Sequence, residues 1–117
     1  MAGENPLQEK SYAFAVRIVQ LSQFLHAEKR EYVLSRQVLR SGTAVGALVS
    51  EAKYAQSRAD FVNKLQVAIK EANETHYWLR LLKDTEYIEC GAYESMERDN
   101  LELLRLLTSI INSTKKQ

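Results

Sequence analysis

Histidine and acidic side chains are the residues of this sequence that could hold a metal ion. Helical bundles that bind two metals combine Glu residues with paired Glu-x-x-His motifs. His26 has Gln23 three residues before it, and His76 has Asn73, so neither histidine completes the motif. A solvated or ion-paired face is the simpler interpretation of the nearby carboxylates, which are Glu51, Glu71 and Glu74. We therefore expect no metal and no cofactor.

The side chains that could act as nucleophiles lack the neighbours that activate such groups. Cys90 is expected in a turn beside Glu89, without a histidine close to it in the sequence, so a reactive thiol is not expected. Ser41, Thr43 and Ser50 fall within a helical pattern, where small side chains are typical of close helix packing. We therefore expect no catalytic residues and interpret the protein as a non-enzyme.

Basic residues give the remaining chemical signal. Arginine beside an aromatic ring can bind phosphate and stack on a base. Arg36 and Arg40 lie one helical turn apart, and Tyr54 is expected on the same helix face. The candidate RNA-binding residues are Arg36, Arg40, Lys53, Tyr54, Arg58 and Lys64. A solvated charged face is the alternative interpretation.

The 117 residues have an ordinary globular composition, with 45% hydrophobic and 26% charged residues. A formal charge of +1 argues against nucleic-acid binding through bulk charge, although it does not exclude a local basic patch. The single cysteine excludes an internal disulfide and predicts a reducing, cytoplasmic setting. The first ten residues show no signal-peptide pattern, and no apolar run approaches the roughly 18 residues that span a membrane.

Four repeating apolar stripes predict the fold, and the chain has only four Gly and one Pro to interrupt them. The most regular stripe comprises Phe61, Leu65, Ala68, Ala72, Thr75, Leu79 and Leu82. Asn5 and Pro6 are typical of a helix start, and Ser57 marks another. We expect helices at about 6–27, 33–55, 58–85 and 93–112. Residues 1–117 are therefore predicted to form a single all-α domain, an antiparallel up-down-up-down four-helix bundle.

Two glycines inside the second helix require a structural reason. Gly42 and Gly46 would each cost about 1 kcal/mol relative to Ala in an exposed helix. They lie among Ser41, Ala44 and Ala47, so little side-chain bulk is present in this stretch. We expect a neighbouring helix to approach closely here. A strand is the weaker alternative, because the helical spacing continues across both glycines.

The chain has more apolar residues than one core requires. At 100° per residue, a second set lies beside or opposite the stripes of helices one, three and four: Tyr12, Val16, Val19, Val67, Trp78, Leu81, Leu103, Leu106 and Ile110. Exposed apolar patches of this kind mark protein–protein contacts. These residues are the candidate interface of a homo-oligomer. The alternative is that a skewed bundle buries them within one chain.

Motifs in the second and third helices resemble a known family. The segment LRSGTAVGA at 39–47 is followed by Glu51-Ala52, Asp60-Phe61 and KEANETHYWL at 70–79. In combination these segments resemble the small four-helix-bundle proteins encoded in 23S rRNA intervening sequences, and the likeness covers nearly the whole chain. His76 stands where the family pattern has Glu. Glu86 stands where Gly usually precedes Tyr-Ile and could accommodate a left-handed residue.

The resemblance implies a bacterial, cytoplasmic, all-helical protein without known catalytic activity, often assembled as a ring-shaped pentamer. The chain is also similar to the accessory variability protein of diversity-generating retroelements, a related pentameric bundle implicated in binding RNA and a reverse transcriptase. Those accessory proteins are strongly basic, whereas this chain is near-neutral. The leading hypothesis is a non-catalytic homo-oligomeric scaffold whose partner is RNA or a ribonucleoprotein. The alternatives are a protein–protein interaction module without a nucleic-acid role and, last, a metal-binding bundle enzyme.

Overall fold

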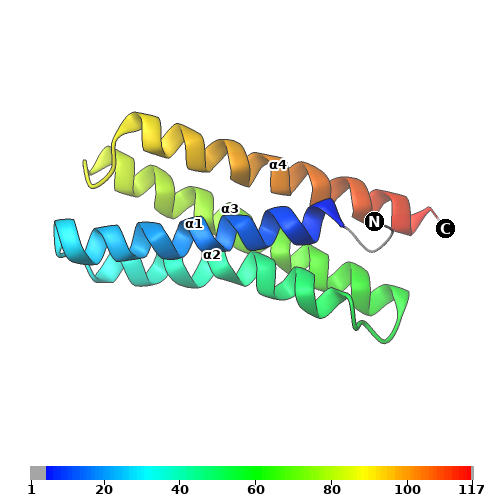
Figure 1. Ribbon diagram of the computed structural model, residues 1–117. Helices are drawn as coiled ribbons and strands as arrows, with labels where there is room; N and C mark the ends of the chain where they lie inside the picture. Colours follow the sequence, from blue (N-terminus) through cyan, green and yellow to red (C-terminus); the bar gives the residue numbers. More distant parts are fainter. Residues whose placement is uncertain (1–4, 117) are drawn as a thin grey trace.

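The computed structural model describes residues 5–116, which form four long helices and no strand (Figure 1). Helix α1 spans Pro6–Lys29, α2 Val33–Ala52, α3 Arg58–Asp84 and α4 Cys90–Lys115. Each helix packs against its neighbours in the sequence, and α4 closes the bundle against α1. The start of α1, the α2–α3 turn and the end of α4 share one end of a bundle 47 Å long. The predicted all-α four-helix bundle is confirmed.

Two predictions concern the chain ends and membranes. The prediction that the first ten residues carry no signal peptide stays a prediction, because residues 1–4 lie outside the described part of the chain. Between residues 5 and 116, no helix is both long and apolar enough to cross a lipid bilayer.

Local side-chain bonds determine where three of the helices begin. Asn5 Oδ1 accepts the N–H of Leu7 at 2.9 Å, and Pro6 opens α1, so the expected start is confirmed. Ser57 Oγ accepts a backbone N–H of the first turn of α3 at 3.0 Å. At α2, the Glu31 carboxylate accepts three backbone N–H groups, from Val33, Leu34 and Ser35. These bonds satisfy donors that a helix start otherwise leaves without partners.

Three helix boundaries lie three residues from the predicted ones, and one of them is the end of α4, at Lys115 rather than near Asn112. Helix α2 ends at Ala52 rather than near Ala55, because the next three N–H groups bond to carbonyls three residues back and form a tight turn. Lys53 and Tyr54 therefore lie in this turn. Helix α4 begins at Cys90 rather than Tyr93, because the N–H of Tyr93 already bonds to the carbonyl of Glu89 at 3.0 Å.

The core is built from one side of each helix, as the stripes predict. Its fully buried apolar side chains include Phe14, Ile18, Val38, Leu65, Leu79 and Leu107. The spacing places Leu21, Leu34, Leu48, Phe61 and Leu104 in the stripes, whereas the residues that are buried there are their neighbours Ser22, Ser35, Val49, Val62 and Leu103. Positions three and four after a stripe residue lie about 40–60° to either side of it. The apolar spacing does not say where the neighbouring helices lie. Their location therefore decides which of these two positions is buried.

Gly42 and Gly46 allow α1 to approach α2. A Cβ atom at Gly42 would lie 2.7 Å from Cδ1 of Ile18, and one at Gly46 would lie 3.1 Å from the carbonyl oxygen of Ser11. Both separations are shorter than an ordinary van der Waals contact. The expected close approach of a neighbouring helix is confirmed, and the neighbour is α1.

We expect Gly42→Ala to destabilise the protein by about 1–2 kcal/mol, because overpacking against the fully buried Ile18 outweighs a gain in helix propensity of about 1 kcal/mol. Urea unfolding of Gly42→Ala, Ile18→Ala and the double variant measures this effect. In the Ile18→Ala background the same glycine replacement should be neutral or stabilising. An equal loss in both backgrounds would contradict the steric explanation.

The end of α3 has the geometry that favours glycine, although no glycine is present. Glu86 has φ of 67°, in the left-handed region. The N–H of Tyr87 bonds to the carbonyl of Leu82 at 2.9 Å, and the N–H of Glu86 bonds to that of Lys83 at 3.0 Å. This pair of bonds is the Schellman motif, in which Gly usually occupies the position of Glu86. The departure from the family pattern at Glu86 therefore leaves the turn intact but strained.

Replacing Glu86 with Gly should stabilise the protein by about 0.5–1 kcal/mol, because relief of left-handed strain exceeds the added entropy of the unfolded chain. Thermal and urea unfolding of Glu86→Gly provide the measurement. Glu86→Ala is the matched control, since it removes the same carboxylate but keeps the strain. If both variants gain equally, the effect comes from charge and not from backbone conformation.

Candidate functional site

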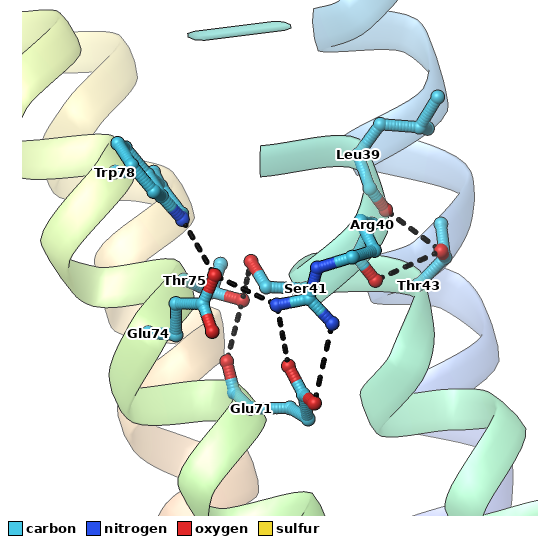
Figure 2. A network of polar contacts seen from close by, with 8 residues as sticks. All are labelled: Leu39, Arg40, Ser41, Thr43, Glu71, Glu74, Thr75 and Trp78. Carbon is cyan, nitrogen blue, oxygen red and sulfur yellow. Dashed lines mark hydrogen bonds and ion pairs between the residues drawn. The ribbon is translucent and has the colours of Figure 1, made fainter. Parts of the chain in front are cut away.

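Arg40 of α2 is held by two carboxylates of α3 (Figure 2). Its Nη2 atom lies 3.0 Å from Oε1 of Glu71 and 2.7 Å from Oε2 of Glu74. Hydrogen bonds to Glu71 and then to Glu74 raise the pKa of Arg40 above its ordinary value. The interpretation of these two carboxylates as an ion-paired face is confirmed. An RNA phosphate would have to compete with both carboxylates for Arg40. RNA binding by Arg40 stays a prediction.

The same ion-pair cluster carries an aromatic side chain. The Nε1–H of Trp78 donates to Oε2 of Glu74 at 2.9 Å, and the ring of Tyr77 meets Trp78 edge-on with 4.9 Å between centroids. This bond from Trp78, followed by that from Arg40, lowers the pKa of Glu74. The polar atom of Trp78 is therefore satisfied within the chain. Its half-buried ring and the exposed ring of Tyr77 remain available for apolar contact.

The other candidate RNA-binding residues lie in two separate places. Arg36 lies in the first half of α2, about 24 Å along the axis from the last residue of that helix. Lys53 and Tyr54 lie in the α2–α3 turn at the far end of α2, and Arg58 and Lys64 lie in the first two turns of α3. The expectation that Tyr54 shares a helix face with Arg36 and Arg40 is wrong, because α2 ends before Tyr54.

The charged residues of the α2–α3 turn and of the start of α3 differ in their interactions within the chain. Tyr54 is 78% exposed, and Nζ of Lys53 lies 5.8 Å from the centre of its ring. Lys64 is ion-paired with Asp60 at 3.4 Å. Arg58 is exposed and has an interaction of its own within the chain. Lys53 and Tyr54 together resemble the cation and aromatic pair that contacts nucleic acid elsewhere.

The candidate interface residues divide by exposure. On α1, Tyr12 is 73% exposed, and Val16 and Val19 are 41% and 40% exposed. Half-buried residues on α3 and α4 make up most of the remainder: Val67, Trp78, Leu81, Leu106 and Ile110. Trp78, Leu106 and Ile110 also pack against the core, as the alternative interpretation of a skewed bundle anticipates.

Leu103 requires a correction. Its side chain is 1% exposed and lies in the core of the single chain, so it is not part of an outer surface. Asn100 is also fully buried, and its Nδ2 donates to the carbonyl of Ala72 on α3 at 2.9 Å. This bond orients α4 so that the side of the helix carrying Leu103 faces inward. The apolar pattern alone gives no sign of this rotation.

His76 has a partner that sequence reasoning missed. Its Nδ1 atom on α3 lies 2.7 Å from Oε2 of Glu97 on α4, and the Glu97 side chain is only 14% exposed. The two residues are far apart in the sequence, and the one signal was the histidine at a position where the family pattern has Glu. Within residues 5–116 no group of three or more His, Cys, Asp or Glu side chains could hold a metal ion.

A groove of about 760 Å³ opens between the second half of α1 and the α3–α4 turn. Its apolar lining includes Leu21, Phe24, Ile88 and Met96, and the exposed Cys90 lies at its edge. The charged side chains around it are mixed: Arg17, Lys29, Lys83, Glu86 and Glu89. Charge therefore selects no class of ligand for this groove.

Comparison with known proteins places this arrangement in a family. Residues 4–109 match the family described as 23S rRNA-intervening sequence protein. The chain belongs to this family. A crystal structure of a protein of unknown function from the S23 ribosomal protein family of Bacteroides thetaiotaomicron is 58% identical, with a TM-score of 0.89. The match covers 90% of this chain and 97% of that one. No curated protein matches the chain.

The match to the 23S rRNA-intervening sequence proteins confirms the family resemblance seen in the motifs at 39–47 and 70–79. The match indicates no catalytic family. For this family member, the clearest local feature is the cluster formed by Arg40, Glu71, Glu74 and Trp78, because it joins α2, α3 and the aromatic surface.

For this 23S rRNA-intervening sequence protein, Glu74→Gln should lower stability at pH 7 by less than about 1 kcal/mol, since the ion pair is partly exposed. The folded pKa of Glu74 lies below its ordinary value of 4.5, so the contribution is present above that pH and is lost as pH falls through the folded pKa. Urea unfolding at pH 7 and pH 3 should show the difference closing. The exposed Glu94→Gln is the control, and a Glu74 difference as large at pH 3 as at pH 7 would contradict the linkage.

Proposed function

We propose that this protein is a non-catalytic, homo-oligomeric scaffold whose partner is RNA or a ribonucleoprotein. The observation that carries the proposal is the apolar and aromatic surface that remains after the single core is filled. Tyr12 is 73% exposed and Tyr77 is 54% exposed, and both lie on helices whose buried sides already face the core. Surfaces of this kind mark protein–protein contacts.

The α3 surface suits self-association because its polar atoms already have partners. Trp78 donates to Glu74, and Glu74 is ion-paired with Arg40, so covering the indole leaves no buried donor unpaired. Tryptophan and tyrosine are enriched among residues that dominate interface energies. The ring-shaped pentamer that the family resemblance implies is the assembly we propose, with α1 and α3 supplying its contacts.

Two features support an RNA or ribonucleoprotein partner. The family takes its description from 23S rRNA intervening sequences, and the exposed Lys53 and Tyr54 form a cation and aromatic pair. Kinship with the accessory variability protein of diversity-generating retroelements stays part of this proposal. The reduced state expected for Cys90 fits a cytoplasmic location.

A protein–protein interaction module without a nucleic-acid role is the second candidate. It is favoured by the ion pairs of Arg40 with Glu71 and Glu74, which engage one of the three arginines that the sequence suggested as phosphate ligands. In this case the same assembly would form, but its mass would not respond to RNA.

Light scattering tests the proposal. The solution mass should correspond to a pentamer of the 13.4 kDa chain and should rise when total bacterial RNA is added at low salt. An assembly that does not respond to RNA would support the second candidate. A monomer at micromolar concentration would contradict both candidates.

Leu81→Asp and Trp78→Ala should shift the light-scattering mass towards the monomer, because each removes half-buried apolar area from the α3 surface. Circular dichroism should show that helicity is retained. Tyr12→Ser tests the α1 surface in the same way. Because Tyr12 is exposed, its replacement should not disturb the core of the monomer. Leu101→Asp on α4 is the matched control outside the proposed interface, and an equal effect there would show general destabilisation instead of a lost contact.

A further inference from the structure

The outer face of α1 carries no charge over much of its length. Between positions 12 and 23 the exposed side chains are Tyr12, Ala13, Val16, Val19, Gln20 and Gln23. The one charged residue of this stretch is Arg17, which is half-buried and pairs with Asp99 on α4. The uncharged face is about 17 Å long, from the rise per residue of an α-helix.

A stretch of α4 of the same length shows what a face left in water usually contains. From Arg98 to Ser109 this helix also exposes six residues, and three of them are charged, at Arg98, Glu102 and Arg105. Helix faces that stay in solvent are typically polar and charged. The cores of protein–protein interfaces are instead depleted of charge and enriched in tyrosine. The α1 face therefore has the composition of a contact surface.

A partner for the α1 face must bring no unpaired charge. A phosphate group of RNA would find no cation on this face, and covering the phosphate with valine side chains would remove its water without compensation. RNA therefore does not suit the α1 face. Large uncharged side chains do, because Ala13, Val16 and Val19 are small and leave room for them.

The α3 surface of the same chain meets these requirements. Tyr77 is 54% exposed, and Trp78 and Leu81 are half-buried. The carboxylate that accepts the indole N–H of Trp78 belongs to Glu74, and this carboxylate is already paired with Arg40 (Figure 2). The α3 surface can therefore be covered without leaving that charge or the indole N–H unpaired.

Exposed charges also flank the α3 surface. Lys70 and Asp84 lie about two helical turns before and after Tyr77 on the same helix. Interface rims stay polar and solvent-accessible. A contact centred on Tyr77 therefore leaves both of these charges in water.

One chain cannot bring the α1 face and the α3 surface together. Within residues 5–116, α1 packs against α2 and α4 but not against α3. The contact therefore requires a second copy. Two different surfaces that meet head to tail generate a ring when the rotation between copies closes.

We propose that the outer face of α1 receives the α3 surface of a second copy, with Tyr77 and Trp78 packed over Ala13, Val16 and Val19. The inference rests on the homo-oligomeric part of the proposed function and names the two surfaces that meet in the assembly. Each chain contributes α1 to one neighbour and α3 to the other. Buried aromatic anchors of this kind carry much of the binding energy of protein interfaces.

Cross-linking between two variants tests the pairing. The exposed Cys90 is first replaced by Ser, and Tyr12→Cys and Tyr77→Cys are then made in separate chains. After subunit exchange, a short bis-maleimide linker should join the two variants into a species of twice the 13.4 kDa chain mass. Neither variant alone should give this species, because the contact joins two different surfaces. Leu101→Cys mixed with Tyr77→Cys is the control and should not link.

A charge placed on the α1 face gives an independent readout. Val16→Glu should weaken assembly roughly tenfold in a light-scattering dilution series, because the new carboxylate is covered without a partner. Adding Tyr77→Lys to the same chain should restore part of the affinity, since the two new charges meet between copies. Leu101→Glu is the matched control, because Leu101 and Val16 are both 41% exposed. Circular dichroism should show unchanged helicity in all variants.

The outcomes separate this pairing from the proposed assembly. If the unaltered chain is a monomer at micromolar concentration, the homo-oligomer fails and the pairing fails with it. If the chain assembles but the Tyr12→Cys and Tyr77→Cys variants do not link, the assembly stands and the pairing is wrong. Linking of Tyr12→Cys to itself would show that α1 meets α1, and this would overturn the inference. Equal weakening by Val16→Glu and Leu101→Glu would overturn it as well.

Discussion

The close approach of α1 to α2 is the contact on which the rest of the bundle depends. Gly42 meets the fully buried Ile18, and Gly46 meets the backbone of Ser11, so α2 lies closer to α1 than side chains would allow. With that position fixed, the adjacent side of α2, about 100° around the helix at Ser41, is set against α3. The hydroxyl groups of Ser41 and Thr75 then lie 2.8 Å apart in the core.

The position of α2 also decides what its arginine does. Arg40 precedes Ser41 in α2, and its guanidinium group reaches Glu71 and Glu74, which lie one turn apart on α3 (Figure 2). An arginine that looks available for phosphate in the sequence becomes a link between helices. Buried hydrogen bonds between three pairs of helices also help to fix how the helices are aligned. They join Ser22 with Ser35, Ser41 with Thr75, and Asn100 with Ala72. Core polar groups of this kind favour one alignment over others, because a slipped helix would leave them without partners.

The up-down topology brings together cations that lie far apart in the sequence. A domain that binds nucleic acid through bulk charge is strongly basic, and this chain is not. The up-down topology nevertheless brings the α2–α3 turn and the end of α4 together, and with them Arg58 and Lys115. At physiological salt the reach of such charges is only about 8 Å, so a local cluster matters more than the total.

The sequence by itself determined the class of fold. The four stripes, the caps at Asn5 and Ser57, and the glycines at 42 and 46 depend on spacing and side-chain type, which local physics reads directly. The family likewise followed from motifs along the chain. Rotation of each helix did not follow, because positions 103 and 104 flank the same stripe, and only the neighbours of α4 determine that Leu103 is buried. Partners distant in the chain, such as Glu97 for His76 and Lys115 beside Arg58, were likewise decided by the tertiary structure. Sequence periodicity records which side of a helix is apolar, whereas the charges that meet across the bundle depend on how the helices are placed in space.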